Sequence, residues 1–119
     1  MENTQKFVIQ KHSKADSVHW DLMFETSLVL QTYRLDLPPE KLSLQTNTAV
    51  KIFDHPLKFL TYQGSVNKGL GTVEIADYGI YTSLTANSKQ QELLLQGKIL
   101  KGNFRLTLIE KDKWEFTKI

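Results

Sequence analysis

The chain has 119 residues, no cysteine, and 15 basic against 13 acidic side chains, for a formal net charge of +2. This length fits one domain with one core, so we expect a single domain over residues 1–119. The absence of cysteine excludes disulfide scaffolds, thiolate zinc sites and cysteine nucleophiles. The nearly balanced charge excludes a histone-like polyelectrolyte. No apolar run is long enough to span a bilayer, so we expect a cytoplasmic protein without a membrane partner.

The first part of the chain alternates apolar and polar residues, which is typical of strands with one buried face. The alternation is strict over residues 18–25, with apolar side chains at Val18, Trp20, Leu22 and Phe24. We expect an earlier strand over residues 7–11, with Phe7 and Ile9 pointing inward. A third strand is expected over residues 28–35, joined to the second by a short turn at 26–27.

The rest of the chain is divided into short pieces by proline and glycine. Pro38 and Pro39 end the third strand, because proline donates no ladder hydrogen bond. Further strands are expected over residues 49–53, 72–75, 80–84, 92–96, 98–100, 104–109 and 114–118. Residues 88–95 also fit one helical turn that leads into a strand. Short strands at this spacing predict an all-β barrel or sandwich.

Three histidines and one aspartate are the first candidates for chemistry. His19 and Asp21 are two positions apart on a predicted strand, so both side chains leave the same outer face. His12 reaches that face if its strand is the neighbour. Two imidazoles and a carboxylate suit a divalent first-row metal such as manganese or zinc. A surface His-x-Asp pair also arises by chance, and that interpretation stays open.

A second ligand set uses the third histidine. His19, Asp21 and His55 match the facial triad of non-haem iron oxygenases, in which two histidines and one carboxylate bind iron. In that interpretation Arg105 would anchor a co-substrate. It leaves His12 without a role.

Several segments, in order along the chain, resemble the 3′-phosphoesterase module of bacterial DNA ligase D. They are residues 7–12 (FVIQKH), 18–25 (VHWDLMFE), 49–57 (AVKIFDHPL), 62–64 (YQG), 71–73 (GTV), 77–79 (DYG) and 97–102 (GKILKG), with Trp114 and Lys118 at the end. The resemblance implies a small antiparallel β-barrel, closed or nearly closed, with about eight strands and an active site on its outer surface.

The resemblance also implies an activity. A divalent metal, manganese first and zinc or another first-row ion otherwise, would activate the phosphate at a nucleic-acid end. The enzyme would remove a 3′-terminal phosphate or ribonucleotide from DNA or RNA–DNA 3′ ends. His12, His19 and Asp21 would hold the metal and His55 would contact the scissile phosphate, which makes these four the catalytic set. A repair polymerase or ligase would be supplied in trans.

Two positions depart from the family pattern. Met23 replaces an arginine and Phe59 replaces a tyrosine, and in the family both lost groups contact phosphate. Losing one such donor typically costs ~10²–10³ in rate. A second function therefore stays open: a weak or inactive relative that binds nucleic-acid ends or a protein partner.

Basic side chains offer a replacement for the lost contacts. If residues 26–27 form a tight hairpin turn, Arg34 lies opposite His19 on the outer face and binds phosphate in place of the missing arginine. The alternative is an ordinary solvated arginine, because the turn fixes the register weakly. Lys11, Lys14, Lys58 and Lys68 are further candidates for a phosphate-contacting patch, or form a solvated face.

Overall fold

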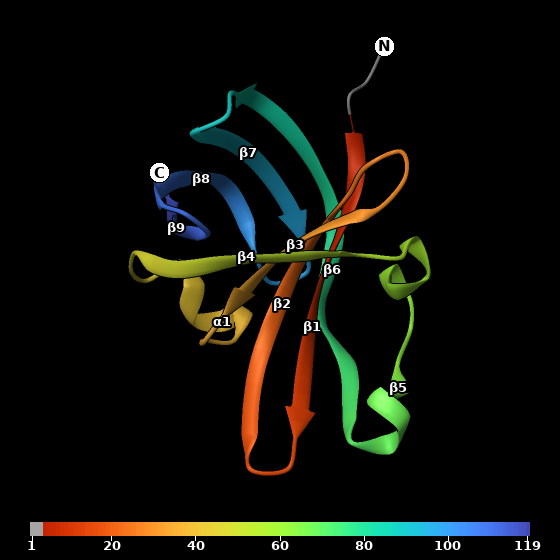
Figure 1. Cartoon of the computed structure of the whole chain (residues 1–119). Helices are drawn as coiled ribbons and strands as arrows, with labels where there is room; N and C mark the ends of the chain where they lie inside the picture. The colour runs from red at the N-terminus through yellow and green to blue at the C-terminus, as the bar shows by residue number, and fades with distance from the viewer. Residues whose placement is uncertain (1–3) are drawn as a thin grey trace.

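The computed structural model describes residues 4–119, which are mostly in strands (Figure 1). The strands are β1 (Thr4–Lys14), β2 (Ser17–Glu25), β3 (Leu30–Leu35), β4 (Asn47–His55), β5 (Gly64–Val66), β6 (Gly71–Ala86), β7 (Gln90–Gly97), β8 (Lys101–Glu110) and β9 (Lys113–Lys118). The short helical segments are α1 (Pro39–Leu42), η1 (Leu57–Leu60) and η2 (Asn67–Gly69). No helix within residues 4–119 has the length and hydropathy needed to cross a bilayer.

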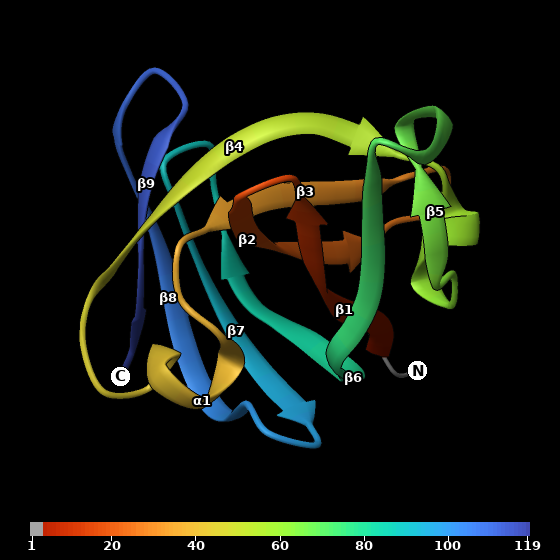
Figure 2. The same ribbon diagram turned by 90° about the horizontal axis from the view of Figure 1, so that it is seen from below.

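Eight strands form a nearly closed antiparallel ring. Their order is β1-β2-β3-β4-β9-β8-β7-β6, and β6 pairs back to β1. The short strand β5 pairs with the beginning of β6. Figures 1 and 2 both show β5 on the side of the molecule away from β7, β8 and β9. This arrangement confirms the predicted all-β fold with a nearly closed ring of about eight strands.

The interior of the ring is filled by alternate side chains from successive strands. Phe7 and Ile9 from β1 and Leu22 and Phe24 from β2 belong to one buried cluster, as the alternation predicted. Trp20 packs against the same cluster. The prediction fails at the start of β2, where Val18 is 45% exposed.

The strand β6 is longer than the sequence predicted. Residues 72–75 and 80–84 were expected as two strands, but they lie in one strand with a register shift against β1. Gly79 does not interrupt it. A Cβ at this position would lie 2.1 Å from the backbone oxygen of Gln96, so glycine lets β6 and β7 approach closely.

Residues 98–100 form the turn between β7 and β8, so the strand predicted there is wrong. The carboxylate of Asp77 accepts hydrogen bonds from the backbone N–H groups of Lys98, Ile99 and Leu100 at 2.8–3.0 Å. This fixes the turn against β6. The helical alternative for residues 88–95 is also wrong, because the chain is in β7 from Gln90 onward.

Candidate metal centre

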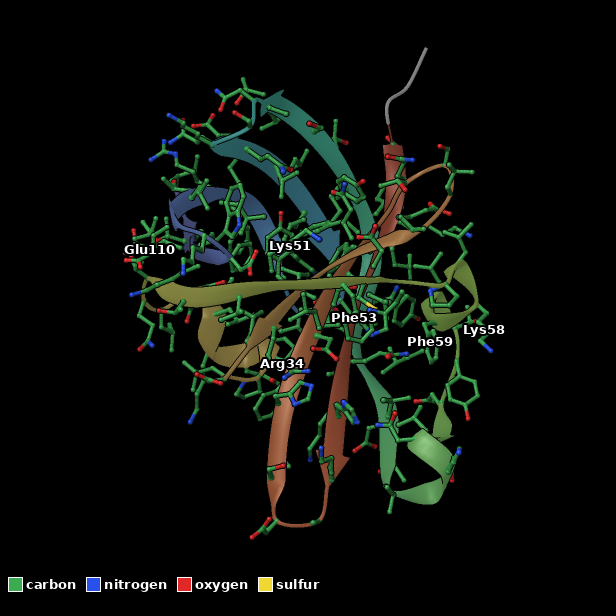
Figure 3. All side chains as sticks on the ribbon, in the orientation of Figure 1. Arg34, Lys51, Phe53, Lys58, Phe59 and Glu110 are labelled. Carbon is green, nitrogen blue, oxygen red and sulfur yellow. The ribbon has the colours of Figure 1, made fainter. Side chains whose placement is uncertain are left out.

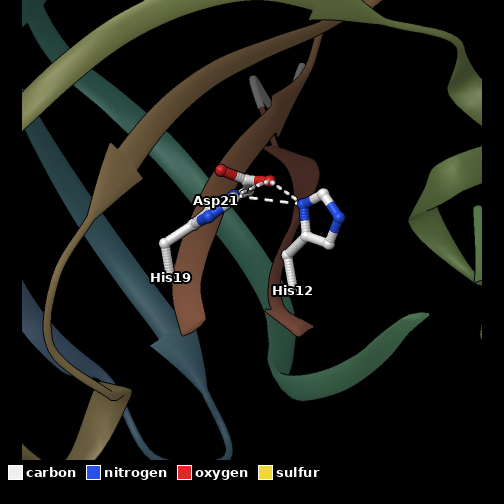
Figure 4. Close-up of side chains that lie close together, drawn as sticks. All are labelled: His12, His19 and Asp21. Atoms are coloured by element: carbon white, nitrogen blue, oxygen red, sulfur yellow. Dashed lines mark hydrogen bonds and ion pairs between the residues drawn. The ribbon is translucent and has the colours of Figure 1, made fainter. Parts of the chain in front are cut away.

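The strands β1 and β2 bring three possible metal ligands together on the outer face of the ring. His12 lies directly opposite His19, and Asp21 follows two residues later on β2. His12 Nδ1 is 3.1 Å from His19 Nε2, which is 3.3 Å from Asp21 Oδ2. The third distance, from His12 Nδ1 to Asp21 Oδ2, is 4.0 Å. Figure 4 shows the three side chains converging on one point.

Burial controls the protonation of this group. Burial, together with the nearby Arg34 and Lys14 charges, lowers the pKa of His19 to about 4. Burial also lowers the pKa of His12, with the His19 charge acting in the same direction. Both imidazoles are therefore neutral at pH 7, which is the form that binds a metal.

The atoms of the group fit a cation. Burial raises the pKa of Asp21, and the Arg34 charge partly offsets this effect. Asp21 Oδ1 and His12 Nε2 are buried without a hydrogen-bond partner. Buried polar atoms normally have partners. The converging atoms are His12 Nδ1, His19 Nε2 and Asp21 Oδ2, which all lie within 4.8 Å of one another, and two neutral imidazoles with a carboxylate suit a divalent ion such as manganese or zinc.

Arg34 lies beside the three residues, but its partner on β2 is two residues further along the chain than predicted. It pairs with Asp21 in the β2–β3 register, whereas the tight-turn prediction placed it opposite His19. The reason is a longer loop: Thr26 bonds back to Val29 through its backbone N–H and its hydroxyl, both at 2.9 Å. Arg34 Nε is 3.8 Å from Asp21 Oδ1, an ion pair too long for a hydrogen bond.

His55 enters the same region from the end of β4. Its Nδ1 is 2.8 Å from Thr32 Oγ1, and that hydroxyl donates to the backbone oxygen of Leu30 at 3.0 Å. When the Thr32 hydroxyl donates to Leu30, its one proton is used, so His55 Nδ1–H is the donor to Thr32 and Nε2 is the ring nitrogen that Thr32 does not engage. Burial lowers the pKa of His55, and the Asp21 charge opposes that effect. Within residues 4–119, the candidate metal group contains His12, His19 and Asp21 without His55.

A cleft of about 510 Å³ joins these side chains. Its lining includes the three candidate metal ligands, Arg34, His55, Lys14 and Phe53. Figure 3 shows Arg34, Phe53 and Phe59 along this side of the sheet. The cleft thus combines a possible metal centre, two cationic side chains, a further histidine, and an aromatic wall.

Next to the cleft, the same outer face carries a second group of buried side chains, which we term the outer apolar cluster. It consists of Val8, Met23 and Leu30, with Phe59, Leu60 and Ile75 packed against them. The sequence placed Met23 on a wet face, but the side chain is fully buried. Residues of η1 cover it, and Gln10 Nε2 ties this segment down by donating to the backbone oxygens of Phe59 at 2.9 Å and Tyr62 at 3.0 Å.

Other sequence candidates lie elsewhere. Arg105 donates from Nε and Nη2 to the same oxygen of Glu92, Oε2, at 3.1 and 2.9 Å, and does not line the cleft. The oxygenase interpretation therefore has no co-substrate anchor at this site. Lys11 is 3.9 Å from Glu74 and lines a different hollow.

Two more lysines border the site. Lys58 and Lys68 line a hollow of about 340 Å³ that shares Phe59, Val66 and Asn67 with the cleft. Sequence reasoning missed two residues of the cleft region, Thr32 and Phe53. The signal for Thr32 was its position two residues before Arg34, on the same face of the strand.

The chain is similar to a defined family of nucleic-acid repair domains. A sequence model of the "DNA Ligase D 3′-phosphoesterase domain" matches residues 10–108. The multifunctional non-homologous end joining protein LigD of Mycolicibacterium smegmatis is 35% identical over 82 residues, covering 66% of this chain and 11% of that protein. The protein of the same name from Pseudomonas aeruginosa is 28% identical over 109 residues, covering 85% of this chain and 13% of that protein.

Proposed function

Because the chain belongs to the DNA ligase D 3′-phosphoesterase domain family, we propose that it is a metal-dependent phosphoesterase acting on nucleic-acid 3′ ends. It removes a 3′-terminal phosphate or ribonucleotide from DNA or RNA–DNA ends and leaves a 3′-hydroxyl. The observation that carries the proposal is the convergence of His12, His19 and Asp21 on one point of a cationic cleft. A polymerase or ligase would use the resulting end.

In this proposal His12, His19 and Asp21 hold one divalent ion, with manganese as the first candidate. Such an ion polarises phosphoryl oxygens and supplies a nucleophilic water at neutral pH. The low pKa of His19, about 4, keeps its ring neutral and available as a ligand well below pH 7. Arg34 stands beside Asp21 and binds phosphate oxygens through its planar guanidinium.

His55 contacts the phosphate through the ring nitrogen that Thr32 leaves free. Protonation at Nε2 makes the ring a charged donor to a phosphate oxygen, and a bound phosphate favours that protonated form. Its Nδ1–H stays on Thr32 Oγ1, so the ring keeps its orientation during proton uptake and release. Arg34 and His55 together supply the charge stabilisation that Met23 and Phe59 do not provide.

The test uses two substrates: a primer–template that ends in one ribonucleotide, and a primer with a 3′-phosphate. Each is incubated with manganese, and appearance of the 3′-hydroxyl is followed by polymerase extension. We expect trimming by the wild type and a loss of more than about 100-fold in His19→Ala and Asp21→Asn, because changing even an outer partner of a ligand costs 10–100-fold. Asp54→Asn is the matched control, since Asp54 is an exposed partner of Lys51 outside the cleft lining.

The proposal fails if the wild type trims neither substrate, or if Asp21→Asn trims as fast as Asp54→Asn. One observation supports a second function. The outer apolar cluster occupies the positions where the family carries two phosphate contacts, as expected of a module that binds 3′ ends without cleaving them. Intact substrate together with tight, end-dependent binding would favour that module.

A further inference from the structure

Phe53 is a large aromatic side chain in the wall of the cleft, and it is 73% exposed. Its ring stacks on the imidazole of His55, with centroids 4.8 Å apart and planes inclined by 21°. One face of the phenyl ring therefore covers His55, and the exposure leaves the other face open to solvent. Figure 3 shows Phe53 on β4, on the side of the sheet that carries Arg34.

We propose that Phe53 is the stacking platform for the nucleobase at the 3′ end. This inference rests on the proposed function, because it assumes that a nucleic-acid end occupies the cleft. It narrows the substrate class to ends with an unpaired or frayed terminal nucleotide. Simple phosphate esters would lack the group that Phe53 recognises.

The position of Phe53 relative to the phosphate contacts carries the argument. His55 and Arg34 both line the cleft, where they would hold the terminal phosphate. The flat, apolar group nearest to that phosphate is the base of the nucleotide that carries it. Phe53 lies directly against His55, so its open face is within reach of the base of that nucleotide. A base stacked there extends a row of three rings, from His55 through Phe53 to the base.

The aromatic chemistry fits a base of any identity. Every base has a π-face, so any of the four bases can stack on an aromatic side chain, and this stacking contributes substantially to affinity. Protonation of His55 strengthens the row, because an imidazolium is attracted to the face of the phenyl ring. In a duplex the terminal base offers only its outer face and is held in place by pairing, whereas an unpaired terminal base can turn to lie flat on the ring. The platform therefore favours an end that leaves the helix.

The other phenylalanine of the cleft lining does not offer this surface. Phe59 packs into the outer apolar cluster and presents its ring at 87° to His55. Phe53 has no such partner in that cluster. A role in the core therefore explains Phe59 and leaves the exposed ring of Phe53 unexplained.

The experiment measures binding to ends that cannot be cleaved. Fluorescent single-stranded oligonucleotides end in a non-hydrolysable 3′-phosphonate, one with a normal terminal base and one with an abasic terminal sugar. Affinities are measured by anisotropy in manganese for the wild type, Phe53→Ala, Phe53→Trp and Tyr78→Ala. Tyr78 is the matched control, because it is 52% exposed and lies outside the cleft lining.

We expect Phe53→Ala to weaken binding of the base-bearing end by about tenfold or more, and to leave the abasic end unchanged. Phe53→Trp should retain or improve affinity for the base-bearing end, and its added indole fluorescence should be quenched by that end. Tyr78→Ala should bind as the wild type does. An unpaired overhang should also bind more tightly than a blunt duplex.

If Phe53→Ala weakened the binding of the base-bearing and the abasic oligonucleotide equally, the inference would be overturned, and Phe53 would act by holding His55 in place. Unchanged affinity for both ends would also overturn it. These results leave the proposed function intact, because the wild type still binds ends. If the wild type binds neither oligonucleotide, the proposed function falls as well.

Discussion

The outer face of β1, β2 and β3 has two halves with opposite chemistry. One half is polar and contains His12, His19, Asp21 and Arg34 around the cleft. The other is the outer apolar cluster, which begins at Met23, only two residues after Asp21. Both halves are built on the same pairing of β1, β2 and β3. They differ in the segments that cover their side chains.

The apolar half is closed by η1, while the polar half has buried atoms without partners. Thr32 joins the two, since it pairs with Met23 across the strands and its hydroxyl is hydrogen-bonded to His55 Nδ1 at 2.8 Å. The two halves differ because the side chains of Met23 and Phe59 are used for packing, whereas the polar half presents a guanidinium beside Asp21, from Arg34 on the neighbouring strand.

The largest expected effect is on the polar half. In the proposed function Arg34 takes the place of the missing family arginine, so we expect Arg34→Ala to lower the rate of 3′-end trimming by ~10²–10³. Arg34→Lys should recover only part of this loss, because an ammonium cannot bind phosphate in a bidentate way. The measurement is single-turnover trimming with manganese. A variant that trims as fast as the wild type would show that Arg34 is an ordinary solvated side chain.

Removing a side chain from the apolar half should affect stability instead of metal affinity. Met23 is fully buried, so Met23→Ala leaves a cavity and should lower the free energy of unfolding by about 2–5 kcal/mol. Urea denaturation measures the change. Manganese affinity at temperatures where the variant is folded should match the wild type. A large loss of metal affinity would contradict the separation of the two halves.

The pH dependence of the metal-free protein should reflect the histidines of the polar half. His12, His19 and His55 all have lowered pKa values in the folded state, that of His19 reaching about 4. Between those values and 6.5 the unfolded chain binds more protons, so stability falls as the pH decreases through this range. The raised pKa of Asp21 acts in the opposite direction, but one group opposes three.

We therefore expect the Tm, measured with a chelator present, to be lower at pH 5 than at pH 7.5. His19→Asn should reduce the dependence, because the asparagine side chain does not titrate in this range. A Tm that rises on acidification would show that Asp21 outweighs the histidines.

The smallest effect is expected at the hollow beside the apolar half. If Lys58 and Lys68 each contact a phosphate of the bound strand, Lys58→Ala and Lys68→Ala should each lower the salt slope of binding by about 0.7 for a single strand. The measurement is oligonucleotide affinity against salt concentration. Lys11→Ala is the control, since Lys11 pairs with Glu74 at a different hollow. If the salt slope of binding were the same in all variants and the wild type, these lysines would be solvated side chains without phosphate contacts.

The strands that carry the site were predictable because alternation over residues 18–25 fixes which side chains share a face. That is how His19 and Asp21 could be placed together before the structure was known. The register to β3 was not predictable, because it depends on how Thr26 folds the loop back onto Val29. The burial of Met23 was missed for a similar reason, since its cover comes from η1, far along the chain.

The proposed activity requires that His12, His19 and Asp21 bind a single divalent ion together. The direct measurement is calorimetric titration of the metal-free protein with manganese and with zinc, in the wild type and four variants. We predict one ion per chain, binding abolished or severely weakened in His12→Ala, His19→Ala and Asp21→Asn, and binding retained in His55→Ala. Binding that survives His12→Ala but is lost in His55→Ala would contradict the claim, and so would a wild type that binds neither metal.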